Sequence, residues 1–173
     1  MKGMTIMLLV MIASFVIAAA WNVPIIKNSV HYVLDPSAGK LIELSPLWGM
    51  IVIVFVITLI LTLVQKYTTN QNELRKLKEE QKILQEEMKK YKDSPEKLME
   101  FNKKQMEFIP KTFDLTMGSI IYTFVPIVLF FRWFNDIFAV INYKYFGFLS
   151  WIWFYLIFSI IFSSILRKVL KVA

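Results

Sequence analysis

The sequence contains no cysteine, one histidine and five glycines among its 173 residues. Without cysteine the chain can form no disulfide, no thiolate metal site and no thiol nucleophile. The single histidine, His31, has no second histidine with which to form a metal pair or a proton relay. The sequence also lacks a Gly-rich phosphate loop, HExxH and GxSxG, which are motifs of nucleotide hydrolysis and peptide cleavage. We therefore expect no enzymatic activity, no cofactor and no metal site.

Hydrophobic residues make up 57% of the chain, which is more than the core of a small globular protein can bury. Three stretches reach the roughly 20 apolar residues that a helix needs to cross a bilayer, namely 46–64, 115–134 and 148–166. A further apolar stretch, 1–21, resembles a signal anchor or a signal peptide, because Ala18, Ala19 and Ala20 offer a small-residue cleavage site. We expect a retained anchor. The sequence thus predicts an all-α polytopic membrane protein with a three-helix core bundle.

The basic residues are distributed unevenly between the segments that flank these spans. Segment 65–114 holds twelve of the twenty Lys/Arg residues, and the basic tail 167–173 holds three more. Segments 22–45 and 135–147 together hold only three. By the positive-inside rule, 65–114 and the C-terminus are cytoplasmic, and 22–45 and 135–147 are outer loops. The five tryptophans fall at the predicted outer ends of the spans, as an interfacial belt would. We expect a multi-pass protein of the plasma membrane.

Segment 65–114 carries two series of seam residues at alternating spacings of three and four, which is the pattern of a coiled coil. They are Leu74, Leu77, Gln81, Leu84, Met88 and Tyr91, followed by Leu98, Phe101, Gln105 and Phe108. Ser94 and Pro95 suit the start of a second helix between the two series. We therefore expect a cytoplasmic antiparallel coiled-coil hairpin. Its first arm should continue straight out of the 46–64 span, because residues 50–94 contain no Gly or Pro, and Pro110 should break its second arm before the membrane.

Lysines cluster at the expected tip of this hairpin, at Lys89, Lys90, Lys92 and Lys97. A basic patch of this kind can meet a phosphate backbone or anionic headgroups, so the ribosome and the lipid bilayer are candidate partners. We expect no sequence-specific binding of nucleic acid, because the twelve basic residues of segment 65–114 stand beside ten acidic ones. The alternative is that the hairpin serves only as a linker or an oligomerisation zipper.

Polar side chains in the three spans are confined to the expected cytoplasmic halves, and those of each span share one helical face. These residues are Thr58, Thr62, Thr116, Ser119, Thr123, Ser159 and Ser163. If the three faces converge, they line a hydrated groove that opens to the cytoplasm. The alternative is that the hydroxyls only join the helices through hydrogen bonds or bond to their own backbone, in which case no groove is needed. Arg132 is the only charged residue inside a span, and we expect it to pair with Asp136 near the outer surface.

With a helical hairpin between the first and second core spans and a polar inner half, residues 40–170 resemble the archaeal YidC-like proteins. The superfamily includes bacterial YidC and the insertase subunit of the ER membrane complex. The resemblance implies a membrane protein insertase without cofactor, whose groove receives nascent transmembrane segments and releases them into lipid, and whose hairpin engages substrate or ribosome. Unlike bacterial members, the chain has three core spans and no arginine in residues 46–64. A coiled-coil membrane scaffold or tether, and then a small channel, are the alternatives.

Overall fold

The computed structural model describes residues 2–91 and 94–172. Its helices are α1 (Lys2–Ala19), η1 (Ala20–Asn22), α2 (Pro24–Leu34), η2 (Asp35–Gly39), α3 (Lys40–Leu44), α4 (Pro46–Thr68), α5 (Gln71–Lys90), α6 (Pro95–Ile141) and α7 (Trp151–Leu170). Four of them, α1, α4, α6 and α7, contain segments long and apolar enough to cross a membrane. The predicted all-α polytopic membrane fold is confirmed.

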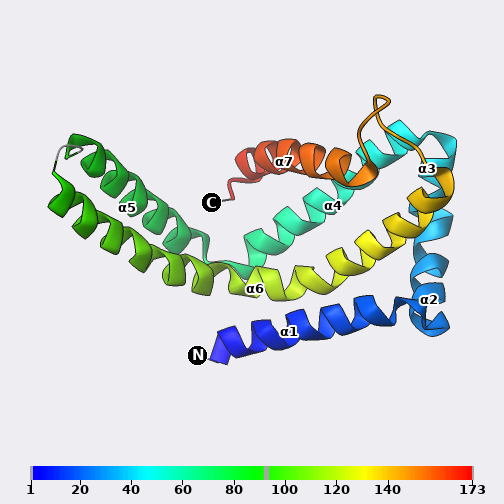
Figure 1. The fold of residues 1–173 in the computed structure, drawn as a ribbon, viewed down its shortest axis with the longest axis horizontal. Coiled ribbons are helices and arrows are strands. Elements are labelled where there is room, and N and C mark those ends of the chain that lie inside the picture. The colour runs from blue at the N-terminus through cyan, green and yellow to red at the C-terminus, as the bar shows by residue number, and fades with distance from the viewer. Residues whose placement is uncertain (1, 92–93, 173) are drawn as a thin grey trace.

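The four long helices run roughly along one another, and α5 and the first part of α6 project from one end as an antiparallel helical hairpin (Figure 1). We term this end of the bundle the hairpin end and the opposite end the distal end. The described ends of the chain point toward the hairpin end (Figure 1). At the distal end, α2 runs across the bundle instead of along it (Figure 1).

The hydrophobic core lies in the distal half of the bundle and is rich in aromatic rings. Trp133, Phe134 and Phe138 of α6 and Phe154 and Tyr155 of α7 are buried there. The ring of Phe134 also lies 5.5 Å from that of Trp151, and the ring of Phe131 lies 5.1 Å from that of Tyr155. Aromatic pairs at these separations contribute about 0.5–1.5 kcal/mol each beyond their buried area. These contacts hold α6 and α7 together at the distal end.

Segment 22–45, expected as an outer loop, is mostly helical and covers the distal end. Ile26, Val30 and Leu34 recur every four residues along α2 and pack on the core, which explains why this segment folds as an amphipathic helix. Ser45 then starts α4 by accepting a hydrogen bond from the backbone of Trp48 at 3.5 Å.

Two expectations for the distal end are not met: Arg132 does not pair with Asp136, and not all tryptophans lie at the membrane interface. The Asp136 carboxylate binds Lys27 Nζ at 2.9 Å, and the Arg132 guanidinium instead lies over the Trp21 ring, 5.7 Å from its centroid. Trp21 and Trp133 are buried and therefore do not belong to an interfacial belt, whereas Trp48 and Trp153 are exposed. The partners of Asp136 come from more than a hundred residues earlier in the chain, which a pattern of near neighbours cannot indicate.

The first arm of the hairpin does not continue from α4, which corrects the prediction. The α4 helix ends at Thr68, and Asn70 starts α5 by accepting a hydrogen bond from the backbone of Glu73 at 3.3 Å. The Gln71 side chain donates to the carbonyl of Gln65 at 3.0 Å and so caps the end of α4. The two helices are therefore separate elements joined at a capped corner.

The prediction that Pro110 breaks the second arm is also wrong, because α6 runs without interruption through Pro110 and Pro126. A proline inside a helix costs about 3 kcal/mol. Packing against α5 on both sides of Pro110 offsets this cost: Leu84 is buried against the second arm, and the side chain of Gln81 donates to the Thr112 hydroxyl at 3.4 Å.

Candidate functional site

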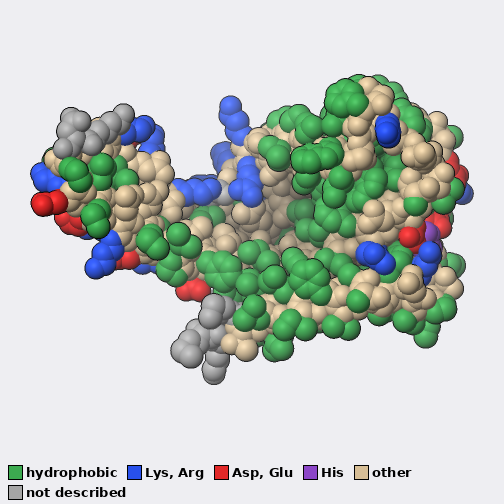
Figure 2. All heavy atoms as spheres, in the orientation of Figure 1, with side chains coloured by type: hydrophobic (Ala, Val, Ile, Leu, Met, Phe, Trp, Pro, Cys, Tyr) green, Lys and Arg blue, Asp and Glu red, His purple; other side chains and the backbone are tan. Residues whose placement is uncertain are grey.

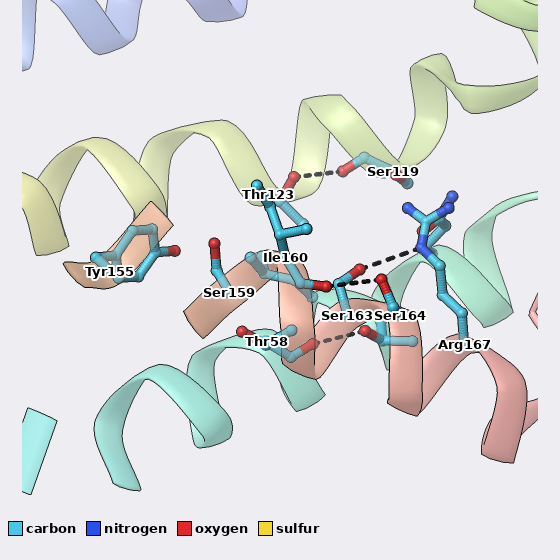
Figure 3. Close-up of a pocket in the computed structure, with 12 residues that line it drawn as sticks. Thr58, Ser119, Thr123, Tyr155, Ser159, Ile160, Ser163, Ser164 and Arg167 are labelled. Carbon is cyan, nitrogen blue, oxygen red and sulfur yellow. Dashed lines mark hydrogen bonds between the residues drawn. The ribbon is translucent and has the colours of Figure 1, made fainter. Parts of the chain in front are cut away.

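A groove of about 490 Å³ lies between α4, α6 and α7 in the half of the bundle near the hairpin (Figure 3). Its polar lining consists of Thr58, Thr62 and Gln65 from α4, Ser119 and Thr123 from α6, and Ser159, Ser163, Ser164 and Arg167 from α7. Thr58 and Thr62 are almost fully buried, so α4 forms the floor and the other two helices form the walls. The surface is hollowed between α6 and α7, with basic side chains at the rim nearest the hairpin (Figure 2).

The structure brings together six of the seven predicted groove residues, from three different helices. The exception is Thr116, which does not line the groove and whose hydroxyl donates to the backbone carbonyl of Thr112 at 2.8 Å. The sequence pattern places the polar residues of each span on one helix face, because residues three or four positions apart share a face. The packing of the three helices then turns these faces toward one groove. Whether these residues bind a substrate stays a prediction.

The groove hydroxyls bond within their own helices. Thr58 donates to the carbonyl of Val54 at 2.6 Å, and Thr62 donates to that of Thr58 at 2.7 Å. Thr123 and Ser159 likewise donate to carbonyls of their own helices at 2.9 Å. Within residues 2–91 and 94–172, no hydrogen bond joins a groove hydroxyl to a neighbouring helix. Of the two parts of the alternative, the geometry disfavours hydroxyls that join the helices and agrees with hydroxyls that bond to their own backbone, although the three polar faces do line a groove.

These local hydrogen bonds decide what the groove offers to a ligand. A hydroxyl that donates its hydrogen to its own backbone keeps lone pairs that can still accept. Apart from Arg167, the walls and floor are therefore rich in hydrogen-bond acceptors and carry no formal charge. Water, backbone N–H groups and polar side chains with donors can bind there.

Arg167 is a groove residue that the sequence reasoning missed, since it was assigned to the basic tail 167–173. It lies in the last turns of α7, and its Nε donates to the Ser163 hydroxyl at 3.2 Å (Figure 3). The signal was present, because Ser159, Ser163 and Arg167 follow one another at intervals of four on the same helical face. Arg167 places a positive charge at the hairpin end of the groove.

Further basic groups from α5 surround this end of the groove. The Arg75 guanidinium donates to the backbone carbonyl of Lys171, which ties the base of the hairpin to the end of α7. Desolvation, and then the positive charge of Arg167, lower the pKa of Lys78. The mouth of the groove near the hairpin therefore has a positive potential that attracts anionic groups.

The structure describes three of the four lysines predicted at the hairpin tip. Lys89 and Lys90 are exposed at the end of α5, and Lys97 is exposed in the first turn of α6 with its Nζ 4.2 Å from the centre of the Tyr91 ring. Lys92 lies outside the described residues. Among the described side chains, no three His, Asp or Glu residues are grouped so that they could hold a metal ion.

Comparison with known proteins identifies a family. Residues 31–146 match the family described as integral membrane protein EMC3/TMCO1-like. This range begins in α2 and ends after α6, so it includes the groove residues of α4 and α6 and excludes those of α7. Searches of curated proteins and of solved structures found no match.

Proposed function

Because the chain belongs to the EMC3/TMCO1-like family of integral membrane proteins, we propose that it is a membrane protein insertase. This family belongs to the Oxa1/YidC-like insertase superfamily. In our proposal the hairpin end faces the cytoplasm, and the groove receives a nascent transmembrane segment and releases it into the lipid of the plasma membrane. The uneven distribution of Lys and Arg supports this orientation.

The observation that carries the proposal is the convergence of hydroxyl side chains from α4, α6 and α7 on one groove in the half of the bundle near the hairpin. The distal half is instead filled by aromatic rings. Placing a charged side chain at the centre of a bilayer costs about 2.5–3.5 kcal/mol on insertion scales. A hydrated groove through half of the bilayer shortens the hydrocarbon layer that a polar flank must cross, and so lowers this barrier.

The chemistry of the groove indicates how a client segment would pass. Donors on its polar flank exchange water for the acceptor oxygens of Thr58, Thr62 and Thr123, and an acidic group on the flank meets Arg167 at the mouth. The apolar part then leaves sideways between α6 and α7, because α4 closes the floor. Its own burial in lipid, at about 25 cal/mol per Å², drives this step without nucleotide hydrolysis.

The hairpin would bring the client to the groove. Its tip presents the exposed side chains of Lys89, Lys90 and Lys97, which suit contact with ribosomal RNA phosphates through charge alone. Its base adjoins the mouth of the groove through Arg75. A ribosome held at the tip would therefore release its nascent chain close to the groove.

Site-specific photocrosslinking to ribosome-bound nascent chains tests the proposal. A photoreactive residue at Thr62 or Ser119 should crosslink to the nascent transmembrane segment, because both positions line the groove. Ile60 and Tyr122 are matched controls, since they lie on the same helices and are exposed but do not line the groove. Stronger crosslinking from the groove positions than from the controls is the expected result.

Other outcomes would favour the alternatives. Equal crosslinking from all four positions, or none from any, would contradict a client groove. Hairpin-to-hairpin crosslinks without nascent chains would favour a membrane scaffold, and ion flux through reconstituted liposomes would favour a small channel.

A further inference from the structure

The turn between α6 and α7 presents two phenylalanines to its surroundings. Tyr145 and Leu149 exchange backbone hydrogen bonds of 2.8 and 2.9 Å, which leaves residues 146–148 as a three-residue tip. Phe146 and Phe148 are 65% and 75% exposed. The backbone of Phe146 has a φ of 55°, a left-handed conformation that bulky residues rarely adopt. An aromatic side chain is thus held outward at a position where Gly or Asn would be less strained.

The turn is fixed to the bundle through Tyr145. This residue is fully buried, and its ring stacks on that of Phe154 at 4.0 Å. Its hydroxyl donates to the carbonyl of Pro46 at 3.1 Å. The ring of Phe146 also lies 6.2 Å from that of Phe154, so one side of it rests on the bundle while most of it stays exposed.

The contact with Pro46 also sets the level of the turn relative to the membrane. Pro46 is the first residue of α4, so the Tyr145 hydroxyl lies where a candidate spanning helix begins. Trp48 of α4 and Trp153 of α7 are exposed close to the same level, and tryptophan is enriched at the interface between membrane and water. The turn projects sideways from the bundle near the distal end (Figure 1). The tip is thus continuous with the surface that faces lipid.

We propose that residues 146–148 insert into the interfacial region of the distal lipid leaflet, so that the turn is a membrane anchor. Phospholipid at the boundary between headgroups and acyl chains is the partner: it accommodates the two phenyl rings, and the exposed side chain of Lys144 can reach the phosphates. The predicted outer loop 135–147 is thereby revised at both ends: the structure extends α6 to Ile141, and in our proposal the tip after Tyr145 lies at the membrane interface. The anchor holds the start of α7, which supplies one wall of the groove, and it does not depend on the proposed insertase activity.

Because the chain has no cysteine, a single introduced cysteine provides a unique site for a fluorophore that is sensitive to its environment. Phe146→Cys and Phe148→Cys would be labelled in the full-length protein in phosphatidylcholine–phosphatidylglycerol vesicles. Quenching would be compared between iodide in water and nitroxide-labelled lipids with the nitroxide near the headgroup. Glu86→Cys on the hairpin is the aqueous control, and Val56→Cys on the exposed face of α4 is the lipid control.

The expected result is severalfold stronger quenching by the shallow nitroxide, and severalfold weaker quenching by iodide, at 146 and 148 than at 86. Iodide quenching equal to that at position 86 would overturn the proposal, because the tip would lie in water. Protection from both quenchers would also overturn the proposal, because protein would then cover the tip. If this protection decreased when the protein was diluted into more lipid, the covering protein would be a second copy of the chain.

A second variant tests the rings themselves. Phe146→Asn combined with Phe148→Ser removes both rings and keeps a residue that tolerates positive φ, so the turn is retained. With the fluorophore on Lys144→Cys, this double substitution should raise iodide quenching severalfold. Unchanged quenching would show that the rings do not hold the turn at the membrane.

Discussion

The indole Nε1 of Trp21 donates a hydrogen bond to Oδ2 of Asp136 over 2.9 Å, which joins the segment after α1 to the distal part of α6. The same carboxylate oxygen lies 2.9 Å from Lys27 Nζ and 3.3 Å from His31 Nε2. Asp136 therefore connects three residues of η1 and α2 to the core helix.

We predict that Asp136→Ala lowers the free energy of unfolding by about 1–3 kcal/mol, because the Trp21 indole loses its acceptor and Lys27 loses its ion pair. Thermal unfolding in detergent micelles would measure this change. Asp114→Ala is the control, since Asp114 is exposed and forms no ion pair with any described residue. Equal unfolding temperatures for the two variants would contradict a central role for Asp136.

Gly49 permits a close approach of α3 to α4. A Cβ atom at this position would lie 2.2 Å from the carbonyl oxygen of Leu41, so Gly49→Ala must push the two helices apart. We expect a loss of about 1–3 kcal/mol of stability, as in other overpacked sites. Gly39→Ala should be nearly neutral, because its Cβ would meet its nearest neighbour at 3.6 Å. Comparable destabilisation by both substitutions in the same unfolding assay would refute this explanation.

Arg167→Gln should impair insertion of clients whose translocated flank is acidic. Glutamine keeps a donor near Ser163 but removes the charge, and a partly hydrated charge contact is worth at most about 1 kcal/mol, or about fivefold in rate. Clients with neutral flanks should be nearly unaffected. Lys168→Gln is the matched control, because Lys168 carries the same charge and does not line the groove. An equal loss for the two variants in a reconstituted insertion assay would assign the effect to general surface charge.

Single cysteines at Thr62, Ser159 and Ser163 should react with a water-soluble maleimide added at the cytoplasmic side. Cysteine at Ile53 should not react, because this residue does not line the groove and lies within the hydrophobic core in the apolar half of α4. The comparison of the two sides of the membrane also tests the orientation. Protection of all three groove positions would mean a dry groove, and the scaffold alternative would then be favoured.

Leu84→Asp should unfold the hairpin, because Leu84 is buried between its two arms. An unpaired charge in an apolar seam costs several kcal/mol, of the order of the stability of such a hairpin. Ile83→Asp changes the neighbouring residue, which is 58% exposed, and should leave the hairpin folded. Hydrogen exchange of the backbone in residues 71–90 distinguishes the two cases. Slow exchange retained in Leu84→Asp would show that the hairpin does not depend on this seam.

The spans and the groove face were predictable because each depends on a local constraint. A bilayer requires about 20 consecutive apolar residues, and hydroxyl residues spaced by three or four share one face of a helix. Asn70 followed by Glu73 is also a local signal, for the start of a helix. This signal outweighs the absence of Gly and Pro in residues 50–94, because a helix also ends where the next residues favour a cap.

Other features depend on tertiary packing, which a local pattern does not contain. Whether Pro110 ends a helix depends on how well its neighbours pack against α5, and this packing is known only once the two arms meet. The acceptor for Trp21 lies 115 residues away. The order of Ser163 and Arg167 along α7 shows that they share a face, but their convergence with α4 and α6 requires the bundle.

The continuity of α6 has a mechanical consequence. Its 47 residues form one unbroken helix about 70 Å long when measured along its bent axis, at a rise of about 1.5 Å per residue, and the helix bends between the hairpin and the bundle (Figure 1). The near end of this helix belongs to the hairpin, and its middle carries Ser119 and Thr123 in the groove wall. Gly118, whose Cβ would lie 3.2 Å from the carbonyl oxygen of Thr68, lies against the end of α4 and next to Ser119. A force applied to the hairpin would therefore reach the groove wall through the continuous backbone of α6.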